Sequence, residues 1–112
     1  MVKQFDIVIV DLDFTQGDEK GENRPCVIIS NNLVNKNSSL IWALPITSRK
    51  PKYVTDIPLK TKQQKVGGLI DSVQIRALDI EARGYKVVDH LQENIQSSIL
   101  ESVEAHIDIK ET

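Results

Sequence analysis

Short apolar runs separated by polar, turn-forming segments make up most of the chain. Several runs are rich in Val, Ile and aromatic residues, which pack well on a pleated sheet and therefore predict β-strands. The predicted strands span 5–13, 25–30, 40–47, 53–59, 69–79 (as one strand or a pair) and 84–88. Pro25 opens the second run, where a missing N–H is tolerated, and Pro58 indicates that the fourth run lies near a sheet edge.

In the last part of the chain the apolar residues recur with a different period. Apolar residues recur every four positions, which predicts one amphipathic helix. The stripe consists of Leu91, Ile95, Ile99, Val103 and Ile107. Asp89, followed three residues later by Gln92, resembles a capping box and predicts that the helix begins near 89 or 90. Many short strands followed by one helix indicate a mainly β, α+β fold, a small barrel-like sheet with a C-terminal helix.

Three polar segments are predicted to be loops or turns: 14–23, the Asn-rich 31–39 and the basic 60–68. The loop at 14–23 is longer than a hairpin turn, and ordered loops of that length are often functional. Alternation along the third strand places one set of side chains on a common face: Leu40, Trp42, Leu44 and Ile46. We therefore expect Trp42, and also Phe14, to lie in the core and not to stack on bases.

Composition narrows the class of protein. A length of 112 residues predicts a single domain, residues 1–112. The one cysteine, Cys26, excludes an internal disulfide and a Cys-based zinc site, and it suits a reducing cytoplasm. The apolar runs are short and no signal peptide is recognisable, so we expect a cytoplasmic protein without a membrane segment. An aromatic content of 4% disfavours a protein that binds single strands mainly by stacking.

The formal net charge of −2 conceals an uneven distribution. Six Lys or Arg residues lie between 49 and 65 against a single carboxylate, Asp56, whereas the last part of the chain is acidic. This asymmetry is compatible with one surface that faces anions. The alternative is that these lysines are merely solvated.

The second and third strands predict a hairpin that brings an arginine to a threonine. With the connection centred near 35 and 36, opposed residues sum to 71, so Arg24 faces Thr47 about 5 Å away. A following proline favours extended backbone at Arg24. A planar, always charged guanidinium suits a phosphodiester, with Thr47 and Ser48 as neutral donors. The alternative is an arginine bonded to the carboxylates of Asp18, Glu19 or Glu22 for structural reasons.

Other catalytic schemes have less support. His90 and His106 lie at opposite ends of the predicted helix, so they are expected to be surface residues and not a paired acid and base. Cys26 lies inside an apolar strand, as an inert thiol would. Gly17 and Gly21 belong to a segment without the Gly-Lys-Ser/Thr of a P-loop.

Taken in order, several short motifs resemble the MazF/PemK (Kid-like) toxins of bacterial toxin–antitoxin systems. They are DIVIVDLDFTQGDEKGENRPCVIIS, then LPITS, then QIRALDIEARG, and the resemblance extends from Asp6 to about Ile107. It implies an SH3-like barrel of five to seven strands. It also implies a metal-independent, cofactor-free endoribonuclease that cleaves single-stranded RNA, or mRNA, by attack of the ribose 2′-OH, leaving a 2′,3′-cyclic phosphate and a 5′-OH.

The resemblance also assigns residues. The R-P arginine corresponds to Arg24, which stabilises charge, and the P-x-T-S threonine corresponds to Thr47, which positions groups or relays protons. The residues expected to contact substrate are Gln16, Gly17, Asp18, Glu19, Ser48, Gln74 and Arg76. PemK-like members carry an acidic residue where this chain has Val73. Asp71, two residues earlier and on the same face of a strand, is a hypothetical substitute as general base.

Partners follow from the same resemblance. It implies a homodimer with an RNA groove across the interface, and a cognate antitoxin whose acidic C-terminal segment occupies that groove. It further implies DNA binding by the toxin–antitoxin complex. Two rival functions remain: a toxin of this fold that binds a protein target such as gyrase, whose members lack the R-P and P-x-T-S pair, and a non-catalytic RNA-binding module, for which Val73 is the best argument.

Overall fold

Seven strands and three helices follow one another along residues 1–12 and 23–109, the part of the chain that the computed structural model describes. The strands are β1 (Asp6–Asp11), β2 (Asn23–Ile28), β3 (Ile41–Thr47), β4 (Asp56–Pro58), β5 (Leu69–Asp71), β6 (Arg76–Leu78) and β7 (Tyr85–His90). The helices are α1 (Asn32–Asn37), α2 (Ile80–Arg83) and α3 (Glu93–Ile107).

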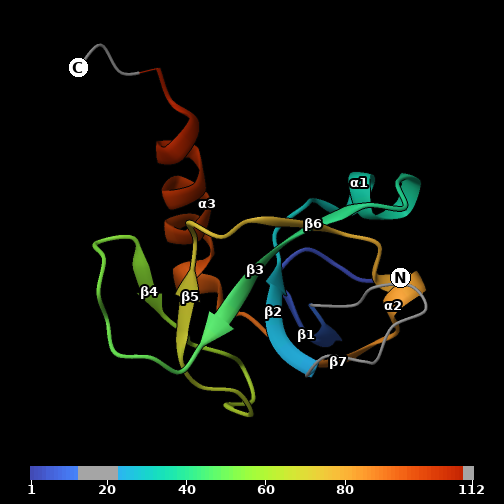
Figure 1. Ribbon diagram of the computed structural model, residues 1–112, viewed down its shortest axis with the longest axis horizontal. Coiled ribbons are helices and arrows are strands. Elements are labelled where there is room, and N and C mark those ends of the chain that lie inside the picture. Colours follow the sequence, from blue (N-terminus) through green and yellow to red (C-terminus); the bar gives the residue numbers. More distant parts are fainter. Residues whose placement is uncertain (13–22, 110–112) are drawn as a thin grey trace.

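The strands form one antiparallel sheet in the order β4-β5-β3-β2-β1-β7. β6 lies off this path and pairs with the first half of β3, while β5 pairs with its last two residues. β3 therefore crosses the middle of the molecule, with α3 beside β4 and β5 and with α1 and α2 on the other side (Figure 1). The expected mainly β fold with five to seven strands and a C-terminal helix is confirmed, as is the edge position of the strand that contains Pro58.

Two hydrophobic cores lie on the two faces of the central strands. One contains Val8 and Cys26, and the other contains Ile7, Val27 and the buried residues of α3. Both faces are covered along most of β1 and along the last three residues of β2, and these segments are accordingly apolar without alternation.

The β2–β3 register agrees with the prediction. The paired residues are Cys26–Pro45, Val27–Leu44 and Ile28–Ala43, and each pair sums to 71. The paired segment ends at Cys26, so Arg24 and Thr47 lie just beyond it on the same two strands.

Two predictions are wrong, one for the segment between β2 and β3 and one for a residue of β3. The Asn-rich segment forms the helix α1, because Asn31 caps it by accepting a hydrogen bond from the backbone N–H of Val34. Trp42 does not lie in the core: it is 51% exposed, although Leu44 on the same face is fully buried. α3 covers that face near its first turns, through Ile95 and Ile99, and leaves Trp42 uncovered.

The C-terminal helix begins later than predicted. It starts at Glu93 after Gln92, whose side chain makes no capping bond, and Asp89 belongs to β7. The Asp89 carboxylate instead accepts backbone N–H bonds from Gln63, Lys65 and His90 at 2.9, 3.1 and 2.8 Å. Burial opposes ionisation of this group, but the hydrogen bonds that it accepts lower its pKa to about 2. Asp89 therefore anchors the basic segment 60–66 to the sheet.

Among the helices of residues 1–12 and 23–109, none has the length and apolar character needed to cross a membrane.

Candidate active site

One cavity brings together five of the predicted site residues. It has a volume of about 590 Å³ and lies where β2 begins and β3 and β5 end. Its lining consists of Arg24, Pro25, Pro45, Ile46, Thr47, Ser48, Arg49, Gly67, Asp71 and Gln74. Arg24, Thr47, Ser48, Asp71 and Gln74 were all expected in the site. The predicted contacts Gln16, Gly17, Asp18 and Glu19 lie outside the described residues.

Arg24 is exposed at the start of β2, beside β1. It pairs with Val10 across the β1–β2 ladder, and Pro25 follows it. The proline keeps the backbone of Arg24 extended, and pairing with β1 holds that backbone. The guanidinium therefore projects from the fixed end of a central strand.

Thr47 is the last residue of β3, and it is held from the other side by β5. Its partner is Leu69. Gly68, with φ of +127°, packs so closely that a Cβ atom would lie 2.5 Å from the carbonyl oxygen of Thr47. Only glycine suits both this backbone conformation and this contact. Gly68 thus allows the chain to enter β5 directly against the site.

Arg49 is a lining residue that the sequence did not single out. Its Nη1 and Nη2 atoms both lie 2.7 Å from the carboxylate oxygens of Asp56, and Nη2 lies 3.6 Å from Oδ2 of Asp71. The side chain of Asp56 is only 1% exposed. The hydrogen bonds from Arg49 hold the pKa of Asp56 well below its usual range. In the sequence, the only indication of this contact is that Asp56 is the one carboxylate among the six Lys and Arg residues of 49–65.

Asp71 and Val73 lie in different cavities. Asp71 is buried in the wall of the cavity that contains Arg24, and its Oδ1 accepts a 3.2 Å bond from the backbone N–H of Val73. The Val73 side chain is exposed and lines a separate apolar groove. The carboxylate that reaches Arg24's cavity is therefore Asp71.

Arg76 does not line this cavity. Its Nη2 donates a 2.7 Å hydrogen bond to the carbonyl oxygen of Leu12, so it ties β6 to the end of β1. Among the described residues, no three His, Cys, Asp or Glu side chains converge to hold a metal ion.

The remaining candidate groups have structural partners. Burial raises the pKa of the Cys26 thiol to about 12, which confirms that it is an inert core thiol. His106 is exposed, as predicted, and its Nδ1 lies 2.7 Å from the carbonyl oxygen of Ser102. His90 is only partly exposed, with Nδ1 3.0 Å from Oδ1 of Asp6. The two histidines lie apart, at the end of β7 and in the last turn of α3.

The basic segment borders the same cavity. A second hollow of about 320 Å³ is lined by residues of 59–67 and by Gln92, and it shares Gly67 with the cavity that contains Arg24. Lys60 lines this hollow. A continuous surface thus leads from Arg24 to a segment that Asp89 holds in place.

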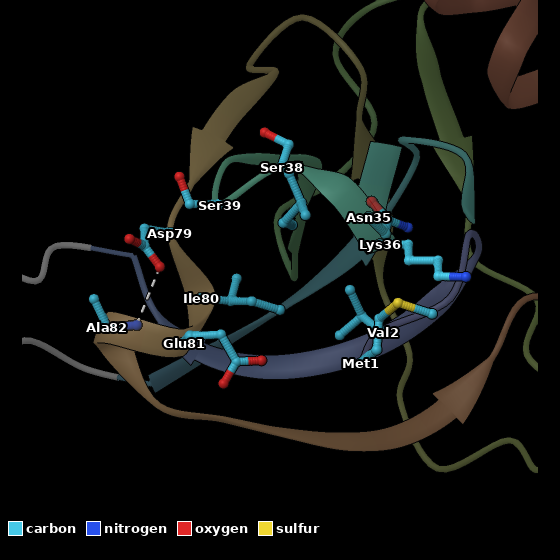
Figure 2. Close-up of a pocket in the computed structure, with 11 residues that line it drawn as sticks. Met1, Val2, Asn35, Lys36, Ser38, Ser39, Asp79, Ile80, Glu81 and Ala82 are labelled. Carbon is cyan, nitrogen blue, oxygen red and sulfur yellow. Dashed lines mark hydrogen bonds between the residues drawn. The ribbon is translucent and has the colours of Figure 1, made fainter. Parts of the chain in front are cut away.

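A cavity of about 680 Å³ at the other end of β3 contains none of the predicted residues. It lies between α1 and α2, and its apolar floor includes Val2 and Ile80 (Figure 2). Lys36 and Glu81 on its rim carry opposite charges, and the carboxylate of Asp79 accepts a hydrogen bond from the backbone N–H of Ala82. With one lysine against two carboxylates, this cavity does not favour the binding of a phosphate.

Comparison with known proteins decides the family. A family model described as "PemK-like, MazF-like toxin of type II toxin-antitoxin system" matches residues 3–107. This chain belongs to the PemK/MazF toxin family. The motifs that carry the resemblance therefore lie within a match that covers nearly the whole chain.

Solved structures show the same fold. MazF from Deinococcus radiodurans has a TM-score of 0.81 at 20% identity, over 96% of this chain and 97% of that chain. A chain from a MazE–MazF structure of the same organism has a TM-score of 0.81 at 18% identity, over 97% of each chain. A mycobacterial endoribonuclease in complex with its cognate antitoxin has a TM-score of 0.78 at 14% identity, over 98% of this chain and 100% of that chain. At these identities the PemK/MazF likeness is one of fold.

Proposed function

We propose that this toxin is a sequence-specific endoribonuclease that cleaves single-stranded RNA in the cytoplasm without a metal ion and independently of the ribosome. The observation that supports this most directly is the convergence of Arg24, Thr47 and Asp71 on one cavity of a PemK/MazF-family chain. A cation, a hydroxyl and a carboxylate are the groups that an internal transesterification of RNA requires.

In the proposed reaction the ribose 2′-oxygen attacks the adjacent phosphorus, and the bond from phosphorus to the 5′-oxygen breaks. Asp71 accepts the proton of the 2′-OH, and Arg24 stabilises the extra negative charge on the phosphoryl oxygens. Arg24 also donates the proton with which the 5′-oxygen leaves. Thr47 and Ser48 donate hydrogen bonds that orient the phosphate. The products are a 2′,3′-cyclic phosphate and a 5′-OH.

The substrate is proposed to run along the basic surface beside the cavity. Gln74 lines the cavity, and Lys60 lines the hollow that adjoins it. Lysine side chains near the RNA would attract its successive phosphates, so the affinity for RNA should fall as the salt concentration rises. Gln16, Gly17, Asp18, Glu19 and Arg76 are proposed as further RNA contacts.

Replacement of Asp71 by Asn tests the assignment of the base. Asparagine keeps the shape but cannot accept the proton, so single-turnover cleavage is expected to fall about 10²–10⁴-fold. RNA affinity should change little, which a binding assay in parallel would verify. Cleavage by Asp71→Asn at the wild-type rate would show that another group is the base.

The function itself is tested by incubating the protein with a long single-stranded RNA in EDTA. Discrete fragments with cyclic-phosphate ends are expected. Intact RNA at high protein concentration, combined with tight RNA binding, would support the alternative of a non-catalytic RNA-binding module. The exposure of Val73, where relatives carry an acid, is the observation that favours this alternative.

We also propose that the protein is a homodimer, on the strength of an apolar groove. The groove has a volume of about 360 Å³ and lies between the end of α3 and the strands β3 and β6. Its lining is Trp42, Ser72, Val73, Ile75, Ala77, Val103, His106 and Ile107. Several large apolar side chains here are exposed, and a second copy of the chain would bury them.

Replacement of Ile75 by Asp is expected to disrupt this dimer, because burying an unpaired carboxylate in an apolar contact is costly. Sedimentation or light scattering should then report the chain mass of 12.6 kDa in place of twice that value. Val54→Asp, at an exposed apolar residue outside the groove, is the matched control and should leave the mass unchanged. A dimer that survives Ile75→Asp would place the interface elsewhere.

A cognate antitoxin is the proposed protein partner. Two of the similar structures are described as a MazE–MazF structure and as an endoribonuclease with its cognate antitoxin. An acidic antitoxin segment would compete with RNA for the basic surface beside the cavity, since both carry negative charge. The DNA binding that the family resemblance implies would then be a property of the whole toxin–antitoxin complex.

A further inference from the structure

The loop between β3 and β4 is organised around a single carboxylate. Asp56 accepts two hydrogen bonds from Arg49, and its Oδ2 also accepts bonds from the backbone N–H groups of Lys52 and Tyr53 at 2.8 and 3.0 Å. The backbone N–H of Asp56 donates back to the carbonyl oxygen of Tyr53 at 3.0 Å. The Asp56 side chain is almost completely buried, and together these bonds set the backbone of the loop.

This arrangement fixes an aromatic ring beside the candidate active site. The guanidinium carbon of Arg49 lies 5.3 Å from the centroid of the Tyr53 ring, so a cation–π contact covers one face of that ring. Tyr53 is nevertheless 57% exposed. Arg49 itself lines the cavity that contains Arg24, so the residue that supports the ring also belongs to the wall of the candidate active site.

Arg49 is poorly suited to bind phosphate itself. Nη1 donates to Asp56 and to the carbonyl oxygen of Lys50, while Nη2 donates to Asp56 and lies 3.6 Å from Asp71. Two carboxylates thus balance its charge. What the guanidinium offers is a rigid, planar support for the ring, as arginine does when it stacks on an aromatic face.

We propose that Tyr53 stacks on an RNA base next to the scissile phosphate, with Arg49 as the positioning residue. The inference rests on the proposed function, because it assumes that RNA occupies the cavity. Bases present an aromatic face whatever their sequence, and a ring whose backbone and one face are already held loses little freedom on stacking. The two exposed lysines that precede Tyr53, Lys50 and Lys52, would contact the flanking phosphates.

The test measures stacking separately from cleavage. Short RNAs that carry the fluorescent base 2-aminopurine in place of each adenine in turn are bound to the Arg24→Ala protein, whose slowed cleavage leaves the RNA intact during the binding measurement. Stacking on Tyr53 should quench the fluorescence at one position. Adding Tyr53→Ala should remove that quenching and weaken binding roughly tenfold or more, whereas Tyr53→Phe should retain both. Val54→Ala, at the exposed neighbouring residue, is the matched control and should behave as the parent.

A second arm uses the cleaving protein. Tyr53→Ala is expected to raise KM roughly tenfold with little change in kcat, because stacking acts on ground state and transition state alike. An abasic nucleotide at the quenched position should abolish the difference between Tyr53→Ala and wild type. Arg49→Lys keeps the charge but loses the planar support, so it should raise KM in the same direction. A melting experiment would verify that this variant is folded at the assay temperature.

The outcomes separate this inference from the proposed function. If the wild-type chain does not cleave RNA but quenching depends on Tyr53, the nuclease proposal fails and the stacking inference holds. If the wild-type chain cleaves RNA and Tyr53→Ala leaves quenching, affinity and KM unchanged, the stacking inference is wrong. Absence of RNA binding by the wild-type chain would contradict both.

Discussion

Arg24→Ala is expected to lower the rate of RNA cleavage by about 10²–10³-fold, the loss typical when one charge-stabilising donor is removed from an active site. The guanidinium projects from an extended, proline-fixed edge of β2 into the cavity, and the other lining cation, Arg49, has carboxylate partners. Arg49 is therefore not free to replace it. Single-turnover cleavage of a synthetic RNA measures the chemical step directly.

Two further variants define the role of Arg24. Arg24→Lys keeps the charge without the planar pair of donors, so it should recover only part of the rate. Lys36→Ala removes an exposed positive charge in α1, away from the cavity, and serves as the matched control for net charge. Equal rates for Arg24→Ala and Lys36→Ala would show that Arg24 contributes only to the overall electrostatic field.

Gly68→Ala is expected to destabilise the fold by about 2–4 kcal/mol and to displace Thr47. The φ of Gly68 is +127°, which alanine rarely adopts, and the new Cβ would lie 2.5 Å from the carbonyl oxygen of Thr47. Backbone must shift to relieve that contact, because no flexible side-chain end is involved. For a chain of this size the melting temperature should fall by roughly 10 °C.

The neighbouring glycine is the control for this prediction. Gly67 has no atom within 4 Å of an added Cβ, so Gly67→Ala should melt near the wild-type temperature. Cleavage by Gly68→Ala, measured well below its melting temperature, should fall by about 10²-fold, because a shift of about 1 Å at Thr47 misaligns the phosphate. Equal melting temperatures for the two variants would contradict the close contact.

The β2–β3 register shows how much local sequence can determine. The connection contains α1, but the runs on either side of it are apolar, so the pairing that places Val27 against Leu44 is strongly specified by which side chains must be buried. This register places Arg24 and Pro25 at the end of the paired segment. The β2–β3 pairing, the C-terminal helix and the neighbourhood of Arg24 and Thr47 were therefore accessible from the sequence.

Predictions from the sequence were wrong where a local pattern was outweighed by contacts with residues far away along the chain. Asp89 resembles a helix cap, yet its carboxylate binds the N–H groups of Gln63 and Lys65, which are 26 and 24 residues away in sequence. Trp42 alternates in phase with buried Leu44, but whether a helix covers it depends on where α3 crosses the sheet. Periodicity assigns a residue to a face and does not say what covers that face.

The sequence by itself determined the class of fold, the hairpin that carries Arg24 and Thr47, and the family motifs, because these depend on short-range pattern and spacing. Only the tertiary structure showed that Asp71 and not Val73 reaches the cavity, that Arg49 binds Asp56, and that Gly68 lies against Thr47. These contacts join β3 to β4 and β5 across loops whose conformation depends on side-chain hydrogen bonds. Such bonds form between residues that no local period relates.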